Sequence, residues 1–166
     1  MKIFIATDHR GYQLKEKIKK WLSHWKYEYK DFGAYSLNED DDYPDFISYV
    51  SEEVSMNPRS SRGIILGGSG QGEAILANKY KGVRAVVYYG GPEDIITLSK
   101  EHNDANILSL GASFLDDKTA RRVIKLWLKT EFSKNVRHAR RIKKIKNIEK
   151  KQGNVDFFGQ NISVIH

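Results

Sequence analysis

Short apolar runs alternate along the chain with segments whose apolar residues recur at helical spacing. The runs are mostly continuous in apolar residues, which is typical of buried parallel strands rather than of strands with one solvated face. Five strands are predicted, at residues 2–6, 27–32, 62–66, 83–88 and 106–110. The alternation therefore predicts an α/β fold, a Rossmann-like three-layer α/β/α sandwich with a five-stranded parallel sheet.

Helices are predicted between and after these strands. The first places Leu14, Ile18 and Leu22 on one face, and Pro44 begins a second helix that runs to about Met56. Further helices are predicted from Glu73 to Lys79, from Gly90-Gly91-Pro92 to near His102, after a cap at Asp116 or Asp117, and along the segment that contains Val136, Ile142, Ile145 and Ile148. The last of them makes a C-terminal basic helix.

The length of 166 residues fits one domain with a tail. The predicted elements stop before Gly153, so we expect a single domain at residues 1–152 and a C-terminal tail at 153–166. No apolar stretch approaches the roughly 20 residues that span a bilayer. The first apolar run is short and is followed directly by polar residues, unlike a signal peptide. Because the chain has no cysteine, disulfides, thiolate metal sites and a cysteine nucleophile are excluded. We expect a cytoplasmic protein without a membrane partner.

The positive charge is concentrated in one element. Residues 134–151 contain nine Lys and Arg residues and one acid, Glu149, whereas the whole chain carries a formal charge of +7. The rest of the chain is thus nearly neutral, and the basic segment has no aromatic residue on which bases could stack. We therefore expect no nucleic-acid partner. Arg137 and Arg141 lie one helical turn apart and could either grip a phosphate or form part of a solvated basic face.

A glycine-rich segment, Gly67-Gly68-Ser69-Gly70-Gln71-Gly72, joins the third strand to the helix at Glu73. Successive backbone N–H groups at such a turn form an anion-binding arrangement. The segment is no Walker A loop, because no Gly-Lys-Ser/Thr follows, and Ile75 stands where a dinucleotide motif would have its third glycine. We favour an anion or oxyanion site over a tight turn that binds nothing.

Other polar residues follow or precede predicted strands. Asp8-His9 follows the first strand and should share one edge of the sheet with Gly67 to Glu73, where parallel sheets bind ligands. His102-Asn103 precedes the fifth strand. These polar residues also have purely structural interpretations: Asp8 could be a helix cap, Glu73 a favourable first-turn acid, and His102-Asn103 an ordinary helix end. A polar loop from Gly33 to Tyr43 contains four successive acids, and no cluster with metal-ligand spacing appears around the glycine-rich turn.

Six segments, in order between residues 2 and 145, match the motifs of one family. They are Thr7-Asp8-His9-Arg10-Gly11-Tyr12, Asp42-Tyr43-Pro44, Gly63 to Lys79, Glu101-His102-Asn103-Asp104-Ala105-Asn106, Leu110-Gly111-Ala112, and Arg137-His138-Ala139-Arg140-Arg141. With these segments the chain resembles the type B ribose-5-phosphate isomerases, a family that includes allose- and galactose-phosphate isomerases.

The resemblance implies an aldose–ketose isomerase that interconverts ribose 5-phosphate and ribulose 5-phosphate through an enediolate, in the pentose phosphate pathway. It implies no cofactor, no metal, and a homodimer or dimer of dimers with sites between subunits. Two alternatives stay open: isomerisation of a six-carbon sugar phosphate of the allose or galactose 6-phosphate type, and a non-catalytic protein that binds sugar phosphate or nucleic acid on the same scaffold.

The resemblance also implies roles for individual residues. Many members carry a cysteine base at the position of Gly67, but the segment here resembles the branch in which the residue matching Glu73 is the base. His102 would be the acid in ring opening, and the Ser69 hydroxyl would help stabilise the oxyanion. The implied substrate-binding residues are Asp8, His9, Gly68, Ser69, Gly70, Gln71, Gly72, Asn103, Arg137 and Arg141.

Two departures from the family pattern concern the substrate. Members often have arginine after Leu-Gly-Ala, where this chain has Ser113, so that one phosphate contact is missing. The segment Tyr88-Tyr89-Gly90-Gly91-Pro92 is also slightly longer than usual. Both bear on the identity of the sugar more than on the type of reaction.

Overall fold

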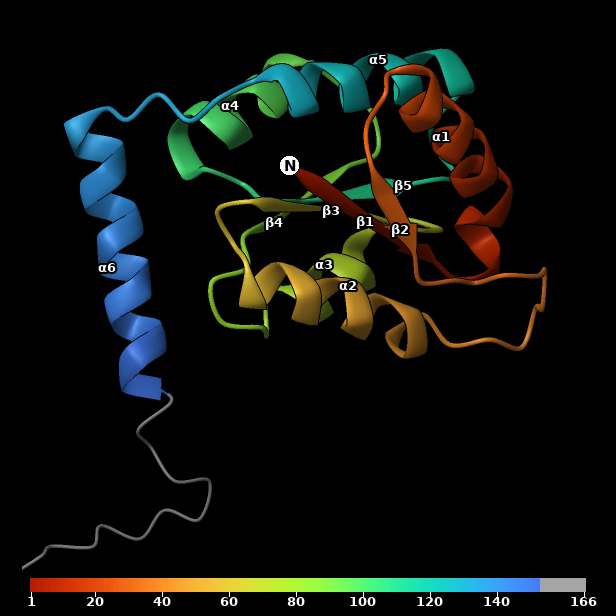
Figure 1. The fold of residues 1–166 in the computed structure, drawn as a ribbon, viewed down its shortest axis with the longest axis horizontal. Helices are drawn as coiled ribbons and strands as arrows, with labels where there is room; N and C mark the ends of the chain where they lie inside the picture. The colour runs from red at the N-terminus through yellow and green to blue at the C-terminus, as the bar shows by residue number, and fades with distance from the viewer. Residues whose placement is uncertain (153–166) are drawn as a thin grey trace, which may run out of the picture. The chain divides into compact units, whose positions relative to one another are not determined.

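A computed structural model describes residues 1–152 and places a five-stranded sheet at the centre of the fold. The strands are β1 (Lys2–Thr7), β2 (Tyr29–Asp31), β3 (Ser61–Gly67), β4 (Ala85–Tyr88) and β5 (Ile107–Gly111), in the order β2-β1-β3-β5-β4. All four neighbouring pairs are parallel (Figure 1). The predicted parallel sheet is confirmed.

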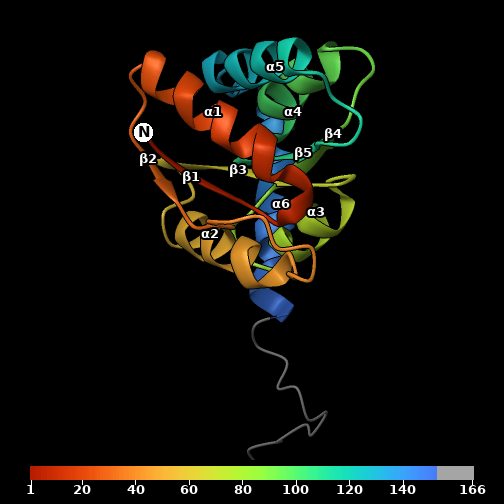
Figure 2. The ribbon, with the colours of Figure 1, turned by 90° about the vertical axis from the view of Figure 1, so that its right-hand side faces the viewer.

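Helices cover both faces of this sheet (Figures 1 and 2). One face carries α1 (Tyr12–His24), α4 (Asp94–Asn103) and α5 (Asp117–Lys129), and the other carries α2 (Pro44–Met56) and α3 (Gln71–Ala77). Two separate apolar clusters form in consequence. Ile18, Leu22 and Trp127 are fully buried in the first cluster, and Ile47 and Val50 in the second. The three-layer α/β/α prediction is therefore confirmed.

The ends of several elements differ from the prediction. Pro44 begins α2, which ends at Met56 as expected, and Asp116 caps α5 by accepting a hydrogen bond from the backbone N–H of Thr119. β2 is shorter than the predicted strand at residues 27–32, because it is an edge strand paired only with β1. The helix expected from Gly90-Gly91-Pro92 begins later, at Asp94, because both glycines have positive φ angles, 125° and 95°, which no right-handed helix contains.

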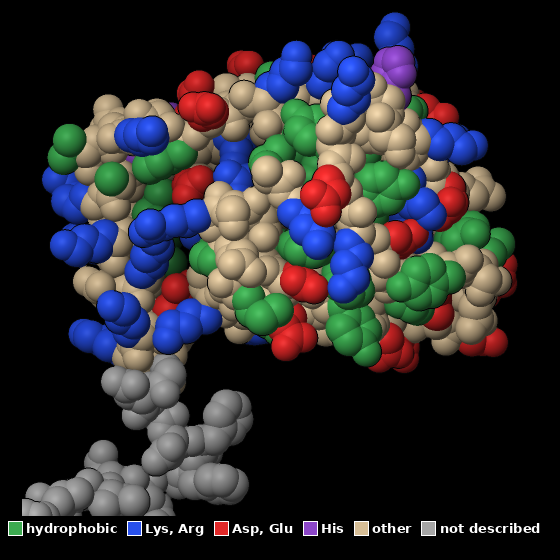
Figure 3. Space-filling view, in the orientation of Figure 1, with side chains coloured by type: hydrophobic (Ala, Val, Ile, Leu, Met, Phe, Trp, Pro, Cys, Tyr) green, Lys and Arg blue, Asp and Glu red, His purple; other side chains and the backbone are tan. Residues whose placement is uncertain are grey.

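The chain forms two compact units, the first at Met1–Ser133 and the second beginning at Lys134. The second contains α6 (Val136–Gln152), whose surface is crowded with Lys and Arg side chains (Figure 3). The expected tail at 153–166 lies outside the described residues, and the single domain over 1–152 stays a prediction. No helix within the described residues combines the length and apolar character that a membrane span requires.

Candidate active site

Polar segments meet where β1 and β3 end. Thr7 pairs with Leu66 and Gly67 pairs with Gly111 at the last register positions of the parallel ladders. The residues that follow, Asp8-His9 after β1 and Gly68 to Glu73 after β3, therefore lie at the same edge of the sheet. This edge is where a doubly wound sheet binds its ligands.

Glu73 is buried against Gly67. It lies in the first turn of α3 and is only 4% exposed. A Cβ built on Gly67 would overlap the Glu73 carboxylate, so the carboxylate occupies the space that a side chain at position 67 would fill. A side chain at position 67 and the Glu73 carboxylate therefore exclude each other from the same space.

Two carboxyl groups at this edge have raised pKa values. Burial raises the pKa of Glu73 above its ordinary value of 4.5, and the charge of Asp8 raises it further. Burial likewise raises the pKa of Asp8, although the backbone N–H of Arg10, which donates to Asp8 Oδ1 at 2.9 Å, opposes the shift. A carboxylate made more basic in this way is a better acceptor for a carbon-bound proton than an exposed one.

The glycine-rich turn is held from both sides while keeping an accessible surface. Gly70 is left-handed, with φ of 76°, and caps α3, while its carbonyl accepts a 2.6 Å hydrogen bond from the buried Ser109 hydroxyl. The ring of Tyr43 packs against Gly72, where a Cβ would come within 2.9 Å of it. Ser69 and Gln71 are exposed, and the Gln71 N–H donates to Ser69 Oγ at 3.3 Å. The turn is thus rigid and open to a ligand.

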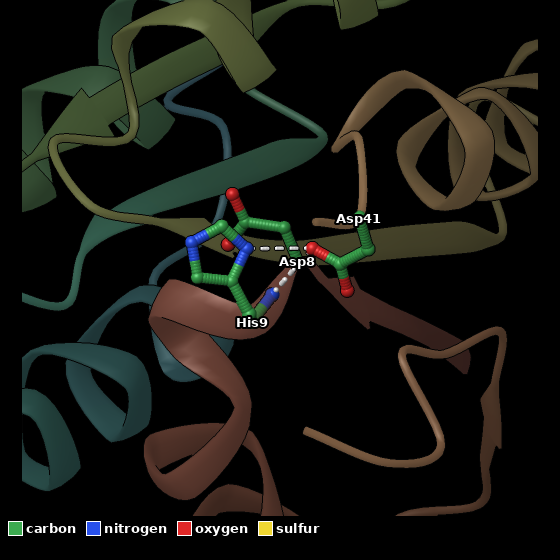
Figure 4. Close-up of side chains that lie close together, drawn as sticks. All are labelled: Asp8, His9 and Asp41. Atoms are coloured by element: carbon green, nitrogen blue, oxygen red, sulfur yellow. Dashed lines mark hydrogen bonds and ion pairs between the residues drawn. The ribbon is translucent and has the colours of Figure 1, made fainter. Parts of the chain in front are cut away.

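Asp41 joins the site from the acidic loop, and the sequence did not single it out. Its Oδ1 accepts a hydrogen bond from the backbone N–H of His9 at 3.0 Å and lies 2.7 Å from His9 Nδ1 (Figure 4). These two contacts hold His9 at both its backbone and its ring, and Asp8 caps the short 3₁₀ helix η1 (His9–Gly11) that begins with His9. The run of four acids was the available signal, but nothing in it distinguished Asp41.

Asp8, His9 and Asp41 are also the group that could offer a metal three ligand atoms among the described residues. One such atom from each lies within 4.8 Å of the other two. This cluster was not foreseen, because Asp41 is 32 residues from His9 in the chain. Asp41 Oδ1 already accepts the backbone N–H of His9, so the hydrogen-bonded pair accounts for the geometry without an ion.

His102 and Asn103 lie at the opposite edge of the sheet from Glu73. They end α4, which leads into the amino end of β5, whereas Glu73 follows the carboxyl end of β3. The length of β5 separates the two edges by about 13 Å. Within residues 1–133, one chain therefore does not bring His102 and Asn103 to the carboxylates of Asp8 and Glu73.

The end of α4 is held firmly where it lies. The Arg84 Nε donates to the carbonyl of Asn103 at 2.9 Å, and Nη2 donates to the carbonyl and the carboxylate of Asp104 at 2.7 and 2.8 Å. Asp104 has the positive φ of 47° that ends the helix. His102 is half-buried, whereas Asn103 is exposed to solvent.

Arg137 and Arg141 belong to α6, in the second unit. Both are exposed, and their spacing of four residues places them on one face of the helix. Their guanidinium groups can together bind one phosphate with several charge-assisted hydrogen bonds.

Comparisons with known proteins find one matching family and several similar isomerases. The ribose/galactose isomerase family model matches residues 3–145. Ribose-5-phosphate isomerase B of Mycobacterium tuberculosis strain H37Rv is 36% identical over 142 residues, 86% of either chain. The structure of the Mycoplasma genitalium isomerase B with bound ribulose-5-phosphate has a TM-score of 0.86 at 37% identity, covering 90% of this chain and 97% of that one. Clostridium thermocellum ribose-5-phosphate isomerase B has a TM-score of 0.84 at 45% identity and covers 92% and 99%.

Proposed function

The chain belongs to the ribose/galactose isomerase family, and we propose that it interconverts ribose 5-phosphate and ribulose 5-phosphate. The observation that carries the proposal is the buried Glu73 carboxylate, held against Gly67 beside Asp8 at the ligand-binding edge of the sheet. The relative solved with ribulose-5-phosphate shares this fold over nine-tenths of the chain. Aldose–ketose isomerisation needs a base of this kind next to a bound sugar phosphate.

Glu73 acts as the base that moves the proton between C2 and C1. A carboxylate within hydrogen-bond reach of both carbons can take the proton from one and return it to the other. Its raised pKa makes it more basic than an ordinary glutamate, which lowers the free-energy difference between it and the carbon acid. Asp8 and His9, beside it, hold sugar hydroxyls or the ring oxygen.

The glycine-rich turn stabilises the charge that develops on the sugar oxygen. Backbone N–H groups from Gly68 to Gly72, with the Ser69 hydroxyl, form a fixed set of dipoles that does not reorganise during the reaction. Left-handed Gly70 keeps these groups in place. Because a positioned base and such donors suffice for an enediolate, the mechanism uses no metal and no cofactor.

The complete site forms between two copies of the chain. His102, the acid for ring opening, and Asn103 lie at the other edge of the sheet from Glu73, so they reach the Glu73 of a second copy. The α6 helix also has exposed Ile145 and Ile148, which are three residues apart on one face and form a small apolar surface that a partner would cover. Arg137 and Arg141 on this helix bind the phosphate, and the molecule is a homodimer or a dimer of dimers.

A six-carbon aldose phosphate is a second candidate substrate. Ser113 lies beside the glycine-rich turn, where its N–H donates to the carbonyl of Gly68 at 3.0 Å. A serine here leaves more room than the arginine that resembling members often have, and it removes a phosphate contact. A six-carbon sugar phosphate, which is longer, would fit the room left by serine in place of arginine. We place either reaction in the cytoplasm, since a chain without cysteine uses none of the disulfides of small secreted domains.

The direct test is a coupled assay of the purified protein with ribose 5-phosphate, allose 6-phosphate and galactose 6-phosphate. Glu73→Gln serves as the matched control, because it keeps the shape of the side chain and removes its basicity. We expect turnover of ribose 5-phosphate that falls roughly 10²- to 10⁴-fold in Glu73→Gln with KM nearly unchanged. Absence of turnover with all three sugars would contradict the proposed function.

A further inference from the structure

One acid of the loop at residues 33–43 is directed inward. The side chain of Asp41 is only 8% exposed, whereas Glu39, Asp40 and Asp42 are exposed. Solvation explains the three exposed acids, but burial of a carboxylate costs free energy that its contacts must offset. The contacts of Asp41 therefore require an explanation of their own.

Those contacts are directed at a single residue. Asp41 Oδ1 accepts the backbone N–H of His9 at 3.0 Å and faces His9 Nδ1 at 2.7 Å (Figure 4). An ionised carboxylate has no proton to donate, so the hydrogen of the second contact is on Nδ1. The backbone contact fixes the oxygen, and the oxygen then fixes the ring.

The other oxygen of Asp41 argues against a stabilising role. Among the described residues, Oδ2 is buried and has no hydrogen-bond partner. Leaving such an atom unpaired destabilises a fold. A carboxylate buried at that cost, with its paired oxygen directed at the histidine proposed to bind the substrate, is better explained by function.

The loop that carries Asp41 is anchored on both sides of the site. At its start, the Thr7 N–H donates to the carbonyl of Gly33 at 2.8 Å, and the Ala34 N–H donates to the carbonyl of Thr7 at 2.7 Å. At its end, the ring of Tyr43 packs against Gly72 of the glycine-rich turn. Asp41 is therefore held in a fixed position between the end of β1 and the start of α3.

From these contacts we propose that Asp41 is a positioning residue for His9. It holds the imidazole in the tautomer with Nδ1 protonated, so that Nε2 is the nitrogen presented to the sugar phosphate. The inference rests on the isomerase function proposed above and adds to it a residue that acts through His9 rather than on the substrate. An aspartate that orients an imidazole in this way fixes both the direction and the hydrogen-bonding role of its free nitrogen.

The first arm of the test reads the tautomer without any need for activity. In protein labelled with ¹⁵N-histidine, the His9 resonances are assigned from the spectrum that lacks them in His9→Gln. We expect Nδ1 to carry the proton in the wild type and in Asp40→Asn, which removes an exposed acid from the same run. In Asp41→Ala the proton should shift towards Nε2. An unchanged His9 spectrum in Asp41→Ala would overturn the proposal.

The second arm is a kinetic cycle on the isomerase reaction. Asp41→Ala should lower kcat/KM roughly 10- to 100-fold, the range found when a partner that orients a metal-binding imidazole is removed. Asp41→Asn keeps an acceptor oxygen and should recover much of the loss. Because Asp41 acts through His9, Asp41→Ala should not lower kcat/KM further in a variant that already carries His9→Ala. Independent, multiplicative losses would show a separate structural role and would overturn the proposal.

The two arms separate this inference from the proposed function. A chain that fails to isomerise any sugar phosphate but shows the tautomer change refutes the function and keeps the Asp41–His9 relationship. Active enzyme with the same tautomer and the same kcat/KM in Asp41→Ala keeps the function and refutes the positioning role. One equivalent of Zn²⁺ that shifts the His9 nitrogens in the wild type but not in Asp41→Ala would show a shared metal site, and would also overturn the proposal.

Discussion

The carboxylate of Glu73 lies against the Cα of Gly67, in the space that a Cβ at position 67 would occupy. Position 67 requires glycine because the Glu73 carboxylate occupies the space of a side chain there, and not because the backbone needs the conformational freedom of glycine. A cysteine at position 67 and the glutamate at position 73 are therefore alternatives that this space cannot hold together.

This relationship predicts the behaviour of a base exchange. Gly67→Cys alone should lower kcat/KM at least about tenfold, because the new side chain displaces Glu73 from its position. Gly67→Cys combined with Glu73→Ala removes the clash and puts a thiolate in the same space, so the double variant should exceed both single variants in kcat. Steady-state kinetics on folded variants, checked by circular dichroism, measure this. A double variant that is the slowest of the three would contradict the shared-space interpretation.

The raised pKa of Glu73 predicts a gain in stability when its carboxyl group is replaced by an amide. Ionising a carboxyl whose pKa is raised in the folded state disfavours folding, and this cost grows as the pH rises through the folded-state pKa. Below the ordinary value of 4.5 both the folded and the unfolded states are protonated, and the cost disappears. Glu73→Gln should therefore raise Tm at neutral pH and leave it unchanged near pH 4.

Thermal unfolding between pH 4 and pH 8 tests that sign. Glu52→Gln, on the exposed side of α2, is the matched control and should leave Tm within the range of ordinary surface changes at every pH. A Glu73→Gln variant that is less stable than the wild type at pH 7 would mean that the carboxylate is stabilised, not strained, by its surroundings.

The sequence predicted what depends on local patterns. Pro44 at the start of α2 and Asp116 as the cap of α5 could be predicted, because the start of a helix favours proline and side chains that accept its free backbone N–H groups. The same is true of the edge shared by Asp8 and Gly67, which follows from the parallel topology alone. Such features need no knowledge of distant contacts.

The features of the site that could not be predicted from the sequence depend on contacts between distant segments. Asp41 lies 32 residues from His9, and nothing in a run of four acids shows which one turns inward. Periodicity cannot place His102 relative to Glu73 either, because both simply follow or precede strands. Only the direction of α4, back towards the amino end of β5, shows that they are at opposite edges.

The proposed chemistry predicts activity that survives chelation. The base is a carboxylate and the oxyanion donors are backbone N–H groups and a hydroxyl, so isomerisation should continue in EDTA at an unchanged rate. Dialysis against EDTA, followed by a metal assay and the coupled assay, measures this. Loss of activity that one divalent ion restores would redirect attention to Asp8, His9 and Asp41, whose ligand atoms lie within 4.8 Å of one another.

Arg137 and Arg141 distinguish a phosphate clamp from a basic surface. If each donates charge-assisted hydrogen bonds worth about 1.5–3 kcal/mol, alanine at either should lower kcat/KM roughly 10- to 200-fold. Lysine should restore only part of the loss, because it lacks the planar fork of arginine. Lys144→Ala and Lys150→Ala, which remove the same charge from α6, should have little effect. Equal and small effects at all four positions would indicate a solvated basic face.

The opposite placement of Glu73 and His102 predicts that two inactive variants restore activity to each other. If each site takes Glu73 from one chain and His102 from another, a mixed dimer of Glu73→Gln and His102→Ala has one doubly damaged site and one intact site. Random mixing makes half of the dimers mixed, so co-refolded protein should recover about a quarter of wild-type activity. Mixing Glu73→Gln with Ser69→Ala is the matched control, because both residues follow β3 in the same chain: there a mixed dimer has no intact site. Recovery in neither mixture would show that Glu73 and His102 do not come from different chains in one site.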